Sequence, residues 1–153
     1  MVLGCDQSYS ATGLVWLNQN FTVAHQQILK FPPSDTRLLG AFKRLCMVVK
    51  DHKPTMAVVE DVAYGTPSRT TLVKLCKLLG VVEAALQAND VPYLVVSASG
   101  CRRWLTGNGH SDKLAVAKEL KRRFKIGFEA DPRNDLSDAA LLAAWAVATK
   151  GHK

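Results

Sequence analysis

Cysteine is scarce in this sequence, and its spacing excludes a structural zinc site. The four cysteines, Cys5, Cys46, Cys76 and Cys101, lie far apart, with no C-x-x-C pair and no pair of histidines beside them. Zinc-binding modules need closely spaced cysteine and histidine ligands, so this class of fold is excluded. Because Cys5 and Cys46 fall in apolar runs, we expect buried free thiols in a reducing compartment.

Long apolar stretches, repeats and linkers are also missing. No run is long enough to span a bilayer, and the opening MVLGCD is too short for the apolar core of a signal peptide. We therefore expect a soluble cytoplasmic protein, or one in the host-cell cytoplasm if the source is viral. With no repeat or linker, residues 1–153 are expected to form a single domain.

Acidic residues are fewer than basic residues in this sequence. Thirteen Asp and Glu face twenty Lys and Arg, which gives a net charge of +7 and a pI of about 9.4. Such a balance in a small domain favours a polyanionic partner, with nucleic acid first, an acidic membrane surface second and a basic surface without a partner as the plain alternative. Hydrophobic residues make up 48%, enough to bury a core, and the 22% of charged residues excludes a disordered tail.

Hydrophobic periodicity predicts an α/β domain with the order βββαβαβαα. Ser34 or Asp35 is expected to cap the first helix, and residues 7–13 and 97–110 are expected to be loops. Two β-α-β crossovers predict a mixed five-stranded sheet flanked by helices. The expected strands are 2–5, 14–17, 21–28, 56–59 and 93–96, and the expected helices are 35–50, 70–89, 111–124 and 135–149.

Four carboxylates stand where a single site would need them. Asp6 follows the first strand, Glu60 follows the fourth, and Asp135 and Asp138 share one face of the last helix. Open α/β sheets place their sites at the carboxyl ends of strands, so we expect the four side chains to converge. Taken one at a time, each has an ordinary structural explanation: a turn for Asp6, a strand-end charge for Glu60, and helix capping for the two aspartates.

Converging carboxylates repel one another unless cations neutralise them. Hard divalent ions such as Mg²⁺ or Mn²⁺ prefer oxygen ligands of this kind. Two such ions can clamp a phosphodiester for in-line attack by water. The pattern therefore predicts a two-metal hydrolytic site.

At these residues the chain resembles the RuvC family of Holliday-junction resolvases, within the RNase H-like superfamily. VLGCDQSYSATGLVWL resembles the opening strand and its aspartate, with Gln7-Ser8 in place of the usual Pro-Gly. MAVVEDVAYG resembles the strand that carries the catalytic glutamate, and NDLSDAALLAAWAVA resembles the D-x-x-D helix. TGNGHSDKLAV resembles the segment with the lysine, and LVKLCKLLGVVEAAL the helix at the dimer interface.

The resemblance implies an RNase H-like fold and paired nicking of a four-way junction by a homodimer of a divergent, phage-type member. It also implies action on forks and other branches, and it leaves a branch-migration partner unidentified. By the same resemblance, Asp6, Glu60, Asp135 and Asp138 are the ligands of two Mg²⁺ or Mn²⁺ ions, and Lys113 is catalytic.

Several further side chains are predicted to contact DNA. Tyr64 follows the catalytic glutamate on a loop, where the resemblance implies an aromatic wedge, although a loop tyrosine packed on its own helix is an equal alternative. The basic residues could instead form a solvated face, which is the favoured explanation for Arg122 and Lys125. The predicted DNA-binding residues are Tyr64, Arg69, Arg102, Arg103, Lys113, Lys118 and Lys121.

Two other functions compete with nuclease activity. DQSYSATG also resembles the phosphate loop of sugar kinases, but the chain has room for one lobe and no Gly-Gly adenosine segment. A non-catalytic binder of branched DNA is the other alternative. Four acids argue against it, because a pure binder gains nothing from repelling phosphate.

Overall fold

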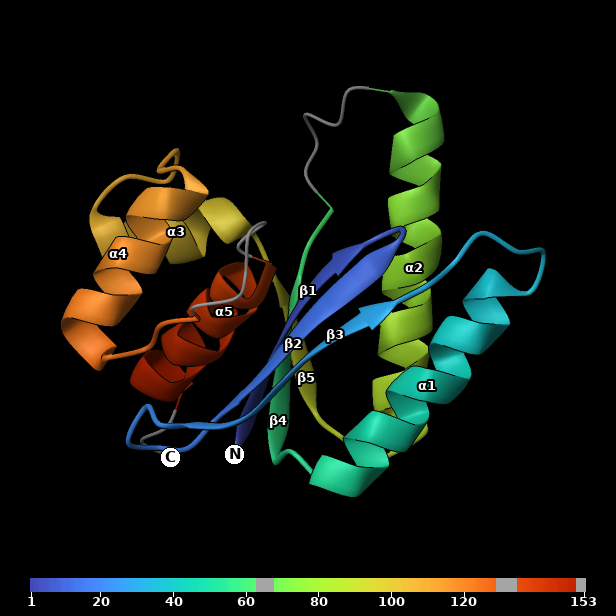
Figure 1. Cartoon of the computed structure of the whole chain (residues 1–153), viewed down its shortest axis with the longest axis horizontal. Helices are drawn as coiled ribbons and strands as arrows, with labels where there is room; N and C mark the ends of the chain where they lie inside the picture. Colours follow the sequence, from blue (N-terminus) through green and yellow to red (C-terminus); the bar gives the residue numbers. More distant parts are fainter. Residues whose placement is uncertain (63–67, 129–134, 151–153) are drawn as a thin grey trace.

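The computed structural model describes residues 1–62, 68–128 and 135–150. Three strands open the chain and the last three helices close it (Figure 1). In chain order the elements are β1 (Val2–Ser8), β2 (Ala11–Leu17), β3 (Val23–Lys30), α1 (Arg37–His52), β4 (Met56–Glu60), α2 (Arg69–Gln87), β5 (Tyr93–Val96), α3 (Ala98–Thr106), α4 (Lys113–Phe124) and α5 (Asp135–Lys150).

The five strands form one mixed sheet in the order β3-β2-β1-β4-β5. β1 pairs antiparallel with β2 and parallel with β4, while β5 extends the parallel half beside β4. The expected mixed sheet flanked by helices is confirmed. Its central strand, β1, therefore has the acid-bearing strand β4 as its direct neighbour.

Helices cover both faces of the sheet, with α1 and α2 on one side and α3, α4 and α5 on the other (Figure 1). Each face of the sheet packs against its helices in a separate hydrophobic core, and alternate residues of each strand belong to alternate cores. Val2 and Val58 pack with α5, whereas Leu3, Cys5 and Val59 pack with α1 and α2. In the described part of the chain, no helix is long and apolar enough to cross a membrane.

The helix α5 lies unusually close to β1 and β2, because two glycines face it. A Cβ on Gly4 would overlap the carbonyl oxygen of Ala139. A Cβ on Gly13 would lie 2.5 Å from the carbonyl oxygen of Asp135. Since real Cβ atoms do not approach that closely, these two glycines set the depth at which the first turn of α5 rests on the sheet.

The structure corrects the expected order by one helix. Residues 97–110 are not a loop, because α3 occupies most of them, and the order is βββαβαβααα. The Ser97 hydroxyl caps the helix by accepting from the Gly100 N–H, and Gly107 ends it with φ +82. The small residues Ser97 and Gly107, which predicted a loop, instead mark the start and the end of a helix.

The first hairpin also differs from the prediction. The strand β1 runs past Asp6 to Ser8, and β2 begins at Ala11, so the expected turn over 7–13 shrinks to Tyr9 and Ser10. The register pairs Gln7 with Thr12 and Ser8 with Ala11, which satisfies the backbone of these small polar residues.

The first helix starts later than predicted, and its predicted cap is wrong. The helix α1 begins at Arg37 with Thr36 at the N-cap, which makes no side-chain capping bond. Neither Ser34 nor Asp35 takes that position. Its last residue is His52, two residues beyond the expected end.

Candidate active site

Strand alternation brings the first two acids together on the face covered by α5. The parallel register pairs Gly4 with Val58 and Cys5 with Val59, so the next pair along is Asp6 and Glu60. Both share the parity of the residues that pack against α5, namely Gly4 and Val58. Two carboxylates therefore lie on neighbouring strands and on one face, as expected from parallel strands.

The first turn of α5 supplies the other two aspartates. Asp135 begins the helix directly over Gly13, which pairs with Asp6 across the hairpin. Asp138 follows three residues later, and its side chain is only 6% exposed. The close approach of α5 therefore carries both aspartates to the edge where Asp6 and Glu60 lie.

A cavity of about 290 Å³ joins three of the four acids. Asp135 is not part of its wall, although the structure ties it to the site through Lys113, whose Nζ lies 3.6 Å from its Oδ1. The residues that line the cavity are Asp6, Gln7, Ser8, Glu60, Asp61, Val62, Leu75, Arg102, Lys113 and Asp138.

Two cations from α3 and α4 face the buried Asp138. The Nζ of Lys113 lies 2.9 Å from Asp138 Oδ2, and Arg102 Nη2 lies 3.5 Å from Asp138 Oδ1. Lys113 is the first residue of α4, which the Asp112 side chain caps by accepting from the Ala115 N–H. The cap fixes the helix start, and with it the backbone from which Lys113 reaches the acids.

The electrostatics of the cavity leave Asp6 as its most perturbed acid. Burial raises the pKa of Asp6 well above its ordinary value, and a hydrogen bond with Glu60 together with the charges of Glu60 and Asp138 raises it further. Burial lowers the pKa of Lys113, but the hydrogen bond and charge of Asp138 and the charges of Asp6 and Asp135 outweigh it, so the net shift is upward. Lys113 therefore stays charged, and negative charge is concentrated where a cation would relieve it.

The donor set fits a hard divalent cation. Within the described residues, Asp138 Oδ1 and Gln7 Oε1 are buried without a hydrogen-bond partner, and both belong to residues of the cavity wall. Buried oxygens of this kind carry a desolvation penalty that a bound cation offsets. In the same part of the chain, no three acidic, His or Cys side chains are already arranged as a metal-binding group, and Asp138 is paired with Lys113 and Arg102.

Cysteine chemistry is not available at this site. Cys101 is buried near the acids, and burial followed by the charge of Glu60 raises its pKa to about 12. Burial likewise raises the pKa of the Cys5 thiol. Both thiols stay protonated at neutral pH, so they are poor nucleophiles and poor metal ligands. All four cysteines are free, as expected, although Cys46 is only half-buried.

The structure separates the described members of the predicted DNA-binding set into four places. Arg102 and Lys113 line the acidic cavity. Arg103 is exposed on α3, and Arg69 starts α2, where it lines a different hollow beside Tyr9. Tyr64 lies outside the described residues.

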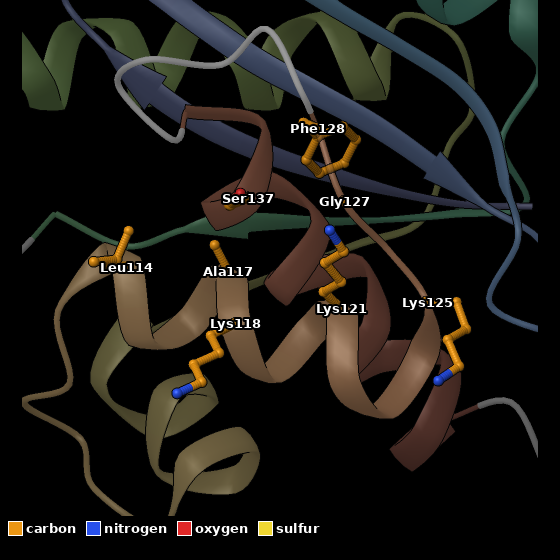
Figure 2. Close-up of a pocket in the computed structure, with 8 residues that line it drawn as sticks. All are labelled: Leu114, Ala117, Lys118, Lys121, Lys125, Gly127, Phe128 and Ser137. Carbon is orange, nitrogen blue, oxygen red and sulfur yellow. The ribbon is translucent and has the colours of Figure 1, made fainter.

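Lys118 and Lys121 do not reach the acidic cavity. They line a separate hollow of about 560 Å³ between α4 and the start of α5, together with Lys125 and Phe128. Figure 2 shows Lys121 extending toward Gly127, while Lys118 and Lys125 point away from it. Arg122 instead pairs with Glu119 at 2.9 Å, in keeping with a solvated helix face.

Gln7 is the site residue that the sequence reasoning missed. Its Nε2 donates to the carbonyl oxygen of Glu60 at 2.6 Å, which ties the end of β1 to the end of β4. The signal was present in the sequence, because Gln7 stands where the resembled motif has a different residue. A polar side chain next to a strand-end acid was read as part of a turn.

Solved structures with similar folds include known junction resolvases. The RuvC of T. thermophilus, solved in complex with a Holliday junction substrate, aligns with a TM-score of 0.79 at 23% identity. That alignment covers 93% of this chain and 89% of the other. The likeness confirms the RNase H-like type of fold that the sequence predicted.

Relatives match along most of the sequence. The RuvC of Nitratidesulfovibrio vulgaris is 33% identical over 107 residues, which are 70% of this chain and 63% of that protein. The RuvC of Ehrlichia canis is 24% identical over 147 residues, or 93% of this chain and 92% of that one. This chain thus spans less than two thirds of the first relative but nearly all of the second.

The match to a family model covers the whole of the site just described. It runs from residue 2 to residue 147, so it includes the strands of Asp6 and Glu60, the lysine of α4 and both aspartates of α5. The family is described as crossover junction endodeoxyribonuclease RuvC. With nearly the full length matched and the acid-bearing elements in the expected order, the chain belongs to the RuvC family.

Proposed function

We propose that this chain is a divalent-metal-dependent endonuclease that cuts four-way DNA junctions, with residues 1–153 acting as one nuclease domain. The observation that carries the proposal is the cavity that unites Asp6, Glu60 and Asp138 with Lys113 and Arg102. Relatives support the proposal, because the chain belongs to a family of metal-dependent crossover junction nucleases. The structure of one family member was solved in complex with a Holliday junction substrate.

The acids would hold the cation. Asp6, Glu60 and Asp138 supply carboxylate oxygens at one cavity, and Asp135 is within reach of it through the first turn of α5. Oxygen ligands of this kind favour Mg²⁺ or Mn²⁺, and four carboxylates suit two ions. When bound, such ions activate water and stabilise the leaving oxygen of a phosphodiester.

The cations beside the acids would orient the scissile phosphate. Lys113 carries a positive charge 2.9 Å from Asp138, and its side chain is 43% exposed. Arg102 also lines the cavity, with its Nη2 3.5 Å from Asp138 Oδ1. A fixed cation at this point stabilises the negative charge that develops on phosphate oxygens during hydrolysis.

The lysines of α4 would bind the DNA backbone leading away from the site. Lys118, Lys121 and Lys125 line one hollow on the α4 side, and no ion pair to them occurs among the described residues. Exposed lysines of this kind suit contacts with backbone phosphates. Arg103 on α3 adds exposed positive charge on the same side of the sheet.

The active form is proposed to be a homodimer joined through α2. Leu72 and Val73 are 37% and 44% exposed, and Cys76 one turn later is also exposed. An exposed apolar helix face suits contact with a second copy of the chain, and two-fold symmetry would supply two cavities for two nicks.

A Leu72→Glu substitution tests the dimer. It is expected to shift the mass measured by light scattering to that of a monomer. A Leu114→Glu control, at a position 74% exposed on α4 across the sheet, should leave the dimer intact, and a wild-type monomer would contradict the proposal.

A substrate panel tests the activity directly. Labelled four-way junction, fork, linear duplex and RNA–DNA hybrid are incubated with the protein in Mg²⁺, Mn²⁺ or EDTA. The proposal expects cutting of the junction with either metal, none in EDTA, and little cutting of linear duplex. Tight junction binding without cutting in any metal would instead establish a non-catalytic binding protein.

A further inference from the structure

Tyr9 occupies the tight turn between β1 and β2, directly after a residue of the acidic cavity. Ser8 lines that cavity, and Tyr9 is the next residue along the chain. Two cations from different helices face the Tyr9 ring. The guanidinium carbon of Arg37 lies 4.5 Å from the ring centroid, and Lys74 Nζ lies 5.4 Å from it. Both distances are within the range of cation–π attraction.

These contacts join two hollows into one basic surface, which we call the Tyr9 strip. One hollow of about 350 Å³ lies between Tyr9 and the first turns of α2. The other, of about 230 Å³, lies at the start of α1 and includes Arg37. The strip consists of Tyr9, Arg37, Arg44, Arg69, Lys74 and Lys77.

Backbone contacts hold part of the strip in position. Arg37 Nε donates to the carbonyl oxygen of Pro32 at 3.1 Å, and Arg44 Nη1 donates to that of Lys30 at 2.7 Å. Each of these guanidinium groups has further N–H donors that can bind phosphate oxygens. Donors fixed before binding lose less conformational entropy when a phosphate arrives.

The positive charge of the strip is not neutralised within the described residues. Every ion pair there involves Arg102, Lys113, Arg122 or Arg123, and none involves a cation of the strip. Asp35, the acid nearest to Arg37 in the sequence, makes no such pair. Five clustered cations without carboxylate partners repel one another, and a polyanion relieves that repulsion.

The strip lies on the opposite side of the sheet from the cations already assigned. Arg37 and Lys74 belong to α1 and α2, whereas Lys113, Lys118 and Lys121 belong to α4 (Figure 1). The acidic cavity lies between the two groups, at the carboxyl ends of β1 and β4. Basic surfaces therefore extend from the cavity on two sides. A linear duplex bound at the cavity does not require both surfaces.

We propose that the Tyr9 strip binds the phosphate backbone of a second arm of a branched DNA, while the α4 lysines bind the first. The inference rests on the proposed junction nuclease and extends it. It assigns selectivity for branched over linear DNA to residues outside the acidic cavity. Tyr9 acts as a positioning residue, since its ring contacts both Arg37 and Lys74 at the turn that follows Ser8.

The test compares junction and duplex binding by the full-length protein in EDTA, where cutting does not interfere. The triple variant Arg37→Gln, Lys74→Gln, Lys77→Gln should bind a four-way junction at least about tenfold more weakly. Its affinity for a linear duplex of one arm should stay within about twofold of the wild type. The salt dependence of junction binding should also fall, by roughly two to three in log–log slope for three lost phosphate contacts.

A charge-matched control separates the strip from net charge. The variant Lys43→Gln, Lys50→Gln, Lys53→Gln removes the same charge from exposed positions of α1 and the residue that ends it. It should bind junction and duplex like the wild type. Equal losses for junction and duplex in the strip variant, or no loss at all, would overturn the inference.

Two variants of Tyr9 test its positioning role. Tyr9→Phe keeps an aromatic ring and should keep the junction affinity and its salt slope, whereas Tyr9→Ala should weaken junction binding about threefold. Equal behaviour of the two would overturn the positioning role. Failure of the wild type to cut any junction in Mg²⁺ or Mn²⁺ would reject the nuclease proposal, yet the EDTA comparison would still decide whether the strip recognises a second arm.

Discussion

Among single residues, Lys113 connects acids from two parts of the fold, the end of β1 and the first turn of α5. It contacts Asp138 and Asp135, and its pKa is raised because their charges and that of Asp6 outweigh the effect of burial. One cation thus balances three acids before any metal ion arrives. The same charge is in place to stabilise a phosphate during cleavage.

Replacing Lys113 by methionine should slow cutting far more than it weakens binding. The loss of one fixed donor to a developing charge typically slows catalysis by about 10² to 10³-fold. Single-turnover rates on a four-way junction measure the chemical step, and junction affinity in EDTA measures binding. A Lys43→Met variant removes a lysine from exposed α1 and should cut normally. A Lys113→Met protein that cuts at the wild-type rate would remove Lys113 from the catalytic set.

The histidines on the opposite side of the molecule should make stability depend on pH. His25 and His52 stack with ring centroids 3.8 Å apart, and both contact Trp16. Burial lowers the pKa of His25, and the charge of His52 lowers it further. The folded state therefore binds the proton less tightly than the unfolded state. Stability should be complete above the ordinary histidine pKa of about 6.5 and should fall as the pH drops below it.

Urea unfolding at pH 7.5 and pH 5 checks this dependence. The free energy of unfolding should decrease at the lower pH in the wild type. His25→Phe keeps a ring on Trp16 but cannot be protonated, so its decrease should be smaller. An identical decrease in both proteins would exclude His25 as a source of the acid sensitivity.

At the scale of elements, the site depends on how deeply α5 rests on the sheet. Gly13 leaves room for the carbonyl of Asp135, and Gly4 leaves room for that of Ala139. These contacts bring Asp135 and Asp138 to the end of β1. The two glycines have no reactive side chain, but the packing that they allow sets the position of the catalytic aspartates.

Gly13→Ala should lower activity more than its effect on stability would suggest. The added methyl must push the first turn of α5 outward, at a cost of about 1–3 kcal/mol for overpacking. Displacement of Asp135 and Asp138 should then weaken metal binding measured by calorimetry and reduce cutting. Gly40→Ala is the matched control, because nothing lies within 4 Å of its Cβ and alanine favours the helix. A Gly13→Ala protein with unchanged cutting would show that the depth of α5 is unimportant.

The sequence predicted the elements whose pattern is local. Apolar runs defined the core strands, and the spacing of Asp135 and Asp138 on one helix face held, as did the parallel neighbours that bring Asp6 beside Glu60. What it missed includes one short local element. The helix α3 looked like a loop because its cap, Ser97, and its end, Gly107, stand close together around a short apolar face.

Other features of the site could not be read from the sequence, because they depend on contacts between distant segments. The cation–π contacts of Tyr9 join residues 28 and 65 positions apart, so no local pattern predicts them. The sequence grouped Lys118 and Lys121 with Lys113 as predicted DNA-binding residues of one basic helix. The helix turns Lys118 and Lys121 into a different hollow.

At the scale of the whole molecule, charge is distributed around one small negative cavity. The net charge of +7 includes every acid of that cavity, so the surfaces on either side of it are strongly positive. A polyanion is drawn to both sides, and only a cation allows its phosphate to approach the acids. This arrangement links three parts of the proposal, namely the need for a metal ion, the binding of DNA and the preference for a branch.

The most direct measurement is the rate of junction cutting by acid-to-amide variants under conditions where the junction is fully bound. Asp6→Asn and Asp138→Asn should each cut on the order of 10³-fold more slowly or worse, while binding the junction as tightly as the wild type in EDTA. Asp51→Asn, an exposed acid at the end of α1, should cut normally. Wild-type cutting by Asp6→Asn or Asp138→Asn would contradict the assignment of this cavity as the hydrolytic centre.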